Sequence, residues 1–201
     1  MLRTERAWVE DGWDREPNYE AMCAARRLLD TDPAGAHAEL RRLAERGSVK
    51  AMVFLGTIYR RGQNAEKDLS EAEEWYLRAA RLDYIPATYL LGVTYSNQRR
   101  YWMAFEQFKI AARNNYVPAI HSLGMMYERG KGVAADPSKA KEIWERGSVF
   151  GNLRTRAALG RLLMSGKFGL VQWLRGMWLE HQAVVLGFII QWRNPKDPRL
   201  D

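Results

Sequence analysis

The fold is decided by one phrase, Ala51-Met-Val-Phe-Leu55-Gly56-Thr-Ile-Tyr59, because nearly the same phrase returns along the chain. Residues 87–95 and 119–127 repeat its small first residue, its Leu-Gly pair and its tyrosine, and residues 155–163 keep most of them. The leucines of these pairs, Leu55, Leu91, Leu123 and Leu159, are 36, 32 and 36 residues apart. A fixed period of this size indicates an array of helical repeats.

A second phrase of alanines and aromatic residues alternates with the first, so each repeat is predicted to be helix, loop, helix. Glycine inside a helix costs about 1 kcal/mol relative to alanine. We therefore expect Gly56, Gly92 and Gly124 to allow close approach of a partner helix. One such helix pair cannot bury its apolar face alone, but stacked pairs can. The second phrase stands at residues 72–80, 104–112 and 140–147.

The alternation of A-x-x-x-L-G-x-x-Y with A-x-x-W-Y-x-x-A-A resembles the Sel1-like repeat family, which is related to the tetratricopeptide repeat. Residues 130–140 are similar to the family connector G-x-G-V-x-x-D-x-x-K-A, residues 62–68 lack its second glycine, and residues 96–100 are four residues shorter. The resemblance covers residues 34–165. It implies an all-α, right-handed α-solenoid of about four to five antiparallel helix hairpins that serves as a binding scaffold.

The chain divides into four segments on this interpretation. Residues 1–18, with Trp8 and Trp13, form an N-terminal arm or a cap over the first repeat, and residues 19–165 form the repeat array. Residues 166–192 form an apolar C-terminal helical segment, and residues 193–201 form a polar tail. Helix starts are predicted where an acid precedes a proline, at Asp32-Pro33 and Asp136-Pro137.

Composition narrows the class of protein. Hydrophobic content of 47% and charged content of 27% indicate a folded protein, and the single Cys23 excludes an intrachain disulfide framework. The charged N-terminus lacks the apolar core of a signal peptide, which predicts a cytoplasmic protein. The net charge of +7 is spread as arginine pairs beside acids, a pattern of solvated helix faces that argues against a nucleic-acid partner.

The apolar C-terminal segment leaves three interpretations open. It is the second helix of the last repeat followed by a capping helix, a docking surface for another protein, or an interfacial membrane helix with basic neighbours. Its uncharged part, residues 182–192, is shorter than the roughly 20 residues that span a bilayer. The basic neighbours are Arg154, Arg156, Arg161, Lys167 and Arg175, and the predicted docking or membrane residues are Trp173, Arg175, Trp178, Phe188, Ile189 and Trp192.

Catalytic motifs are missing from the sequence. His37, His121 and His181 stand in different repeats without a second ligand at metal spacing, and neither H-E-x-x-H nor a phosphate-binding G-x-x-x-x-G-K-[ST] loop is present. No nucleophile with a neighbouring base can be assembled. We therefore predict no catalytic residue, no metal, no cofactor and no enzyme activity.

The resemblance to tetratricopeptide-like arrays implies that the first helix of each repeat lines a concave partner-binding groove. Ordinary solvated helix surface is the alternative for each of these positions. The predicted groove residues are Val53, Thr57, Arg60, Tyr89, Val93, Asn97, His121, Met125, Glu128 and Arg161.

Two functions follow as hypotheses. The first is a bacterial adaptor, cytoplasmic or peripheral at the inner membrane, that holds a membrane-associated enzyme of polysaccharide or envelope biosynthesis or export. The second is a soluble chaperone, regulator or immunity-type inhibitor that binds one soluble partner in the groove.

Overall fold

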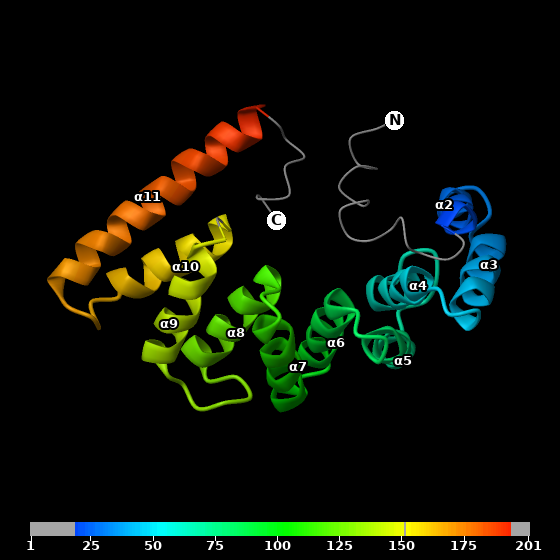
Figure 1. Cartoon of the computed structure of the whole chain (residues 1–201), viewed down its shortest axis with the longest axis horizontal. Helices are drawn as coiled ribbons and strands as arrows, with labels where there is room; N and C mark the ends of the chain where they lie inside the picture. Colours follow the sequence, from blue (N-terminus) through cyan, green and yellow to red (C-terminus); the bar gives the residue numbers. More distant parts are fainter. Residues whose placement is uncertain (1–18, 151, 194–201) are drawn as a thin grey trace. The chain divides into compact units, whose positions relative to one another are not determined.

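The computed structural model describes residues 19–150 and 152–193, which contain ten α-helices and no strand (Figure 1). The all-α prediction is confirmed. The described residues form two compact units, a first unit that ends at Gln98 and a second unit that begins at Arg99. The helices are α2 (Tyr19–Leu28), α3 (Pro33–Glu45), α4 (Val49–Arg61), α5 (Leu69–Ala80), α6 (Ile85–Asn97), α7 (Tyr101–Arg113), α8 (Val117–Arg129), α9 (Pro137–Ser148), α10 (Leu153–Met164) and α11 (Leu170–Arg193).

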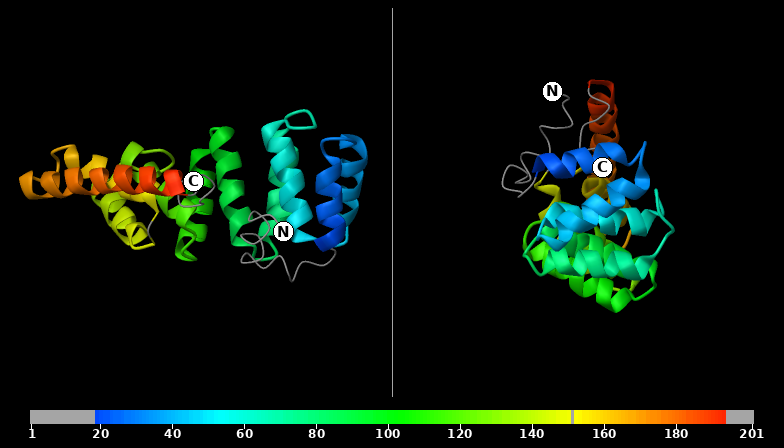
Figure 2. Two further views of the ribbon diagram at one scale, coloured as in Figure 1. Left: turned by 90° about the horizontal axis from the view of Figure 1, so that it is seen from above. Right: turned by 90° about the vertical axis from the view of Figure 1, so that its right-hand side faces the viewer.

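The first unit stacks α2 to α6 so that each helix packs on the next one in the chain. Figure 2, left, shows α2 and α3 in blue beside the cyan helix α4. Leu40 and Leu43 of α3, Leu55 of α4 and Trp75 of α5 form the buried core between these helices. We call α4, α6, α8 and α10, which carry the Leu-Gly phrase, the A helices, and the helices that follow them the B helices.

The second unit packs α7 on α8, α8 on α9, α9 on α10 and α10 on α11. Its core around the last two pairs includes Trp144 of α9, Leu159 and Leu163 of α10, and Leu179 of α11. The segment after the connector 165–169 is one continuous helix of 24 residues, which Figure 1 shows as α11. One interpretation of the sequence, a last repeat helix followed by a capping helix, predicts two helices there. Gly176 and Gly187 do not interrupt α11, so the structure has one helix.

Two glycines of the A helices, Gly56 and Gly124, are explained by aromatic side chains of the B helices. A Cβ placed on Gly56 would lie 2.7 Å from the buried ring of Tyr76, and one on Gly124 would collide with the indole of Trp144. The predicted close approach is confirmed at these two positions. At both positions the contact is made by an aromatic ring of the following helix.

The last helix pair meets differently. A Cβ on Gly176 would lie 2.6 Å from the carbonyl oxygen of Gly160, and a Cβ on Gly160 would lie 3.0 Å from the carbonyl oxygen of Gly176. Two helix backbones therefore touch here, whereas the pairs α4–α5 and α8–α9 insert an aromatic ring.

The glycines of the connectors are explained by their backbone conformation. Gly130 ends α8 with a φ of 67° and Gly132 has a φ of 73°, both in the left-handed region that glycine adopts without strain. In the connector that lacks the second glycine, Gly62 has a φ of 68° and Asn64 stands in the place of Gly132 with a φ of 61°. Asparagine tolerates this region better than most residues, so the looser sequence keeps the same turn.

The predicted helix caps are confirmed. The Asp32 side chain accepts a hydrogen bond from the Gly35 amide at 2.9 Å, and the Asp136 side chain accepts one from the Lys139 amide at 3.0 Å. In both cases the proline that follows starts the helix.

Candidate functional site

The predicted groove residues of α4 are organised by one hydroxyl from α5. The Tyr76 side chain is fully buried, yet its hydroxyl lies 3.0 Å from Thr57 Oγ1 and accepts a hydrogen bond from Arg60 Nε at 3.3 Å. Val53, one turn before Thr57, is half-buried and packs against the core of the first unit. Thr57 and Arg60 are therefore brought together and held by Tyr76.

The predicted residues of α6 form a graded stripe on one side of the helix. Tyr89 and Val93 are half-buried, and Asn97, one further turn along, is exposed. Their spacing of four residues keeps them on one face.

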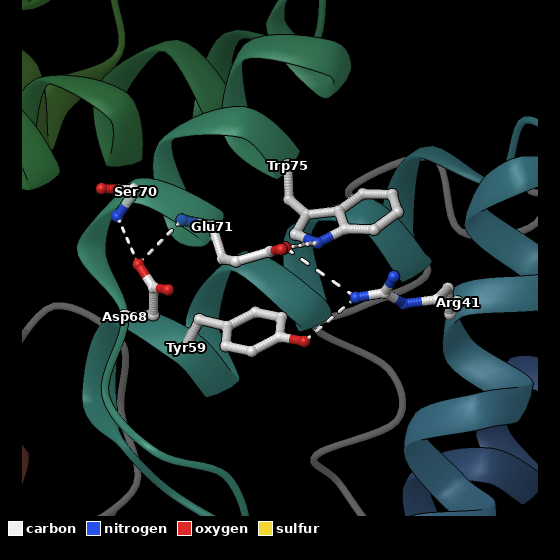
Figure 3. Close-up of polar contacts among 6 residues, drawn as sticks. All are labelled: Arg41, Tyr59, Asp68, Ser70, Glu71 and Trp75. Atoms are coloured by element: carbon white, nitrogen blue, oxygen red, sulfur yellow. Dashed lines mark hydrogen bonds and ion pairs between the residues drawn. The ribbon is translucent and has the colours of Figure 1, made fainter.

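A polar cluster between α3, α4 and α5 was missed by the sequence analysis (Figure 3). Arg41 Nη2 donates a hydrogen bond to the Tyr59 hydroxyl at 3.2 Å and lies 3.9 Å from Glu71 Oε2. Glu71 in turn accepts from Trp75 Nε1 at 3.2 Å. Each of these groups has a partner, so the cluster braces neighbouring helices and offers no free ligand. The i, i+4 spacing of Glu71 and Trp75 was the available signal.

His37 lies beside this brace. Its ring meets the Tyr59 ring edge-on with centroids 5.2 Å apart. Burial and then the Arg41 charge lower the pKa of His37, while Glu71 acts in the opposite direction. The neutral form of this imidazole is thus the one that fits the folded chain.

Two of the predicted residues of the second unit, His121 of α8 and Arg161 of α10, are brought near one another. The His121 ring stacks on the indole of Trp144 with centroids 6.1 Å apart, and Trp144 Nε1 donates to the His121 carbonyl at 3.1 Å. Burial, followed by the charges of Arg154, Arg161 and Arg129, lowers the pKa of His121. The predicted residue Arg161 therefore lies within electrostatic reach of His121.

The other two predicted residues of α8 have local partners. Met125 is half-buried and packs against the core around the last two helix pairs. Glu128 lies 4.0 Å from Arg129, its neighbour in the chain. The charged groups that act on His121 are the arginines Arg154, Arg161 and Arg129, so the charge around it is positive.

The predicted docking residues of α11 differ in exposure. Trp178 is 58% exposed, Phe188 is 71% exposed and Ile189 is 40% exposed. Trp173 is half-buried, and Arg175 Nη1 forms an ion pair with Glu145 Oε1 of α9 at 2.8 Å. The Trp192 side chain lies outside the part of the chain that the structure describes.

The described residues contain neither a metal-binding cluster nor a membrane-spanning helix. In residues 19–150 and 152–193, no group of three His, Cys, Asp or Glu side chains is placed to hold a metal ion. Within the same ranges, no helix combines the length and the apolar character needed to cross a membrane.

Comparison with known proteins points to one repeat family. The Sel1 repeat model matches residues 49–84 and 117–148, and no curated protein matches the chain. A Sel1 repeat protein from Oxalobacter formigenes superposes with a TM-score of 0.66 and 24% identity, over 74% of this chain and 63% of that protein. A protective antigen of uropathogenic Escherichia coli strains with an SLR fold gives a TM-score of 0.67 and 27% identity, over 77% of this chain and 36% of that protein.

These matches support the coarse functional class. The chain spans less than two thirds of the length of either protein. Sel1 repeats mediate protein–protein interactions, and their fold is generally a non-catalytic scaffold. The resemblance deduced from the sequence is confirmed: this chain carries Sel1 repeats, at residues 49–84 and 117–148, in an all-α repeat fold.

Proposed function

We propose that this chain is a non-catalytic adaptor that holds an acidic segment of a protein partner on the A helices of its second unit. The supporting observation is a set of three exposed arginines, Arg154, Arg161 and Arg129, within electrostatic reach of His121. Burial first, and then these three charges, lower the pKa of His121. A surface of one sign steers and selects a segment of the opposite sign.

The same surface is rigid where a partner would sit. Trp144 is fully buried, stacks on His121 and fills the space over Gly124. Arg154 and Arg161 project from α10, whose core side is fixed by the buried Leu159. A preorganised surface loses less conformational entropy on binding than a mobile one.

As the partner we propose a membrane-associated enzyme of a bacterial polysaccharide or envelope pathway, which would place the adaptor in the cytoplasm at the periphery of the inner membrane. The net charge of +7 supports this location, because an anionic leaflet attracts basic proteins. The Sel1 resemblance supports the adaptor role, since members of that family commonly serve such pathways.

A soluble partner is the second candidate, in which the chain acts as a chaperone, regulator or immunity-type inhibitor. Two arginines near the apolar C-terminal helix favour it. Arg175 is paired with Glu145, and Arg156 Nη2 donates to Gln182 Oε1 at 2.6 Å. These contacts direct both guanidinium groups to neighbouring side chains instead of a lipid surface.

Charge reversal tests the proposal. The full chain with Arg154→Glu and Arg161→Glu is compared with a matched control, Arg46→Glu and Arg113→Glu, which changes two exposed arginines away from the A helices. Each is used to capture partners from separated membrane and soluble fractions. We expect one partner to be captured by the wild type and the control, and lost by the A-helix variant.

The fraction that holds this partner separates the two candidates. A partner in the membrane fraction supports the adaptor of a membrane-associated enzyme, and one in the soluble fraction supports the second candidate. Equal capture by both variants would contradict the proposed site.

A further inference from the structure

The side of α11 that faces α10 carries three small residues where the two helices come closest. Gly176 touches the Gly160 backbone, Ala183 is 6% exposed, and a Cβ on Gly187 would lie 3.7 Å from Leu153. Leu179, which is 7% exposed, is the one large apolar side chain of α11 in the buried core of the second unit. Packing on α10 therefore uses little of the apolar surface of α11.

The opposite side of α11 carries large side chains in rows with a spacing of seven residues. A spacing of seven returns to nearly the same side of a helix. All the apolar members are exposed, from 40% at Val185 to 78% at Val171, and His181 is also exposed. The rows are Leu170, Met177 and Val184; Val171, Trp178 and Val185; and Leu174, His181 and Phe188, which together we call the α11 seam.

The α11 seam is large for an uncovered surface. From the exposed fractions of its eight apolar side chains, it leaves on the order of 900 Å² of surface, above the roughly 300–600 Å² of a typical largest apolar patch. Each partner in a standard interface buries about 800 Å². The seam alone thus has the area of one side of a standard interface.

The seven-residue spacing indicates that the partner is a helix. Apolar residues repeated in this way form a straight stripe along a helix, and a second helix with the same spacing covers it by inserting side chains between them. We propose that the α11 seam binds a second copy of this chain through an antiparallel pair of α11 helices. This interface leaves the A helices free, so it is independent of the proposed partner site.

The sizes of the seam residues favour the antiparallel arrangement. With a twofold axis at His181, the middle residue of the third row, Leu174 lies level with Phe188, and Trp178 lies level with Val184, next to Val185. Each large side chain then faces a smaller one, which fills space evenly. A parallel pair would set Trp178 against its own copy and Phe188 against its own copy.

The charges of the second unit disfavour a lipid surface as the occupant. Two of the five basic residues that the sequence placed beside this segment contact side chains of the second unit: Arg175 pairs with Glu145, and Arg156 donates to Gln182. Interfacial helices instead surround their apolar face with basic residues.

The mass of the full chain in solution tests the proposal. We expect twice the chain mass of 23.3 kDa for the wild type, and 23.3 kDa for the variant with Trp178→Glu and Phe188→Glu. The matched control is Trp102→Glu with Val149→Glu, two side chains that are 65% and 83% exposed outside α11, and it should keep the doubled mass. Because all four side chains are exposed, circular dichroism should show both variants folded.

Two more variants strengthen the mass measurement. His181→Leu removes the polar group from the middle of the α11 seam, so we expect the dimer dissociation constant to fall several-fold. In a Cys23→Ser background, a short thiol-reactive cross-linker should join two chains with His181→Cys but not two chains with Leu170→Cys. The antiparallel pair sets the two copies of position 170 roughly 30 Å apart, at 1.5 Å per residue.

Three results would overturn the proposal. A monomeric wild type means that a second copy does not cover the seam, and a monomer that binds phosphatidylglycerol vesicles only when Trp178 and Phe188 are intact means that lipid covers it. A doubled mass that survives Trp178→Glu and Phe188→Glu places the dimer interface elsewhere. Cross-linking through Leu170→Cys contradicts the antiparallel orientation.

Discussion

The helix pairs α8–α9 and α10–α11 use the same Leu-Gly phrase for different contacts. In α8–α9, Gly124 receives the buried indole of Trp144. In α10–α11, Gly160 receives the backbone of α11 at Gly176. The difference shows that a glycine in an A helix accepts either an aromatic ring or a helix backbone. When it accepts the backbone, the large apolar residues of the B helix are left facing outward.

The largest effect should be the difference in stability between alanine substitutions of a buried and an exposed tryptophan. Trp144→Ala removes a fully buried indole and should lower the free energy of unfolding by about 3–5 kcal/mol. Trp178→Ala, in dilute chains where dimers dissociate, should change it by less than about 1 kcal/mol, because the side chain is 58% exposed. Urea denaturation measures both, and equal losses would contradict the difference between the two helix pairs.

The next effect tests the backbone contact. Gly176→Ala places a Cβ 2.6 Å from the Gly160 carbonyl oxygen and should destabilise the second unit by about 1–3 kcal/mol. Gly187→Ala is the control, because its Cβ meets only Leu153 at an ordinary 3.7 Å. The control should be neutral or stabilising by up to about 1 kcal/mol through helix propensity. Thermal melts that rank the two variants in the opposite order would contradict the close contact.

A smaller effect is expected at the start of α9. Asp136→Ala removes the hydrogen bond to the Lys139 amide and should reduce stability by about 1 kcal/mol. Asp136→Asn keeps a capping oxygen and should restore most of the loss. Chemical denaturation of the three proteins checks this, and an asparagine variant as unstable as the alanine variant would argue against capping.

The smallest effect is a pH dependence at α8. The pKa of His121 is lowered from its ordinary value of 6.5, so its neutral form is preferred in the folded chain. The stability that it contributes is therefore complete above pH 6.5 and is lost as the pH falls from 6.5 toward the folded pKa. Chemical denaturation at a series of pH values measures the free energy of unfolding. As the pH falls through this range, that free energy should decline less steeply for His121→Gln than for the wild type. Identical curves would contradict a buried neutral His121.

Much of the fold could be predicted from the sequence because the same pattern of packing residues recurs in each repeat. The recurrence of the Leu-Gly phrase predicted the A helices, and Asp32 and Asp136 predicted two helix starts. The partner of each glycine could not be predicted. Tyr76 and Trp144 belong to the second phrase, but the sequence does not show that they meet Gly56 and Gly124. Gly176, which meets Gly160, belongs to a segment that departs from the repeat.

The candidate site was predictable only where one helix supplied its residues. The spacing along α8 placed His121 and Glu128 in the same helix, but the charges of Arg154 and Arg129 on His121 depend on tertiary packing. The brace from Arg41 to Glu71 likewise joins two helices 30 positions apart in the chain. Arg129, Arg154, Arg41 and Glu71 do not belong to the repeated Leu-Gly phrase, so their contacts have no signal in a single sequence.

Hydroxyl-radical footprinting of the full chain over a dilution series tests the central claim most directly, because it reports the exposure of individual side chains. Trp144 should be protected at every concentration and Trp102 labelled at every concentration. We predict that Trp178 and Phe188 are labelled when the chain is dilute and become protected as the concentration rises. Labelling of these two residues that is independent of concentration would contradict coverage of the α11 seam by a second copy.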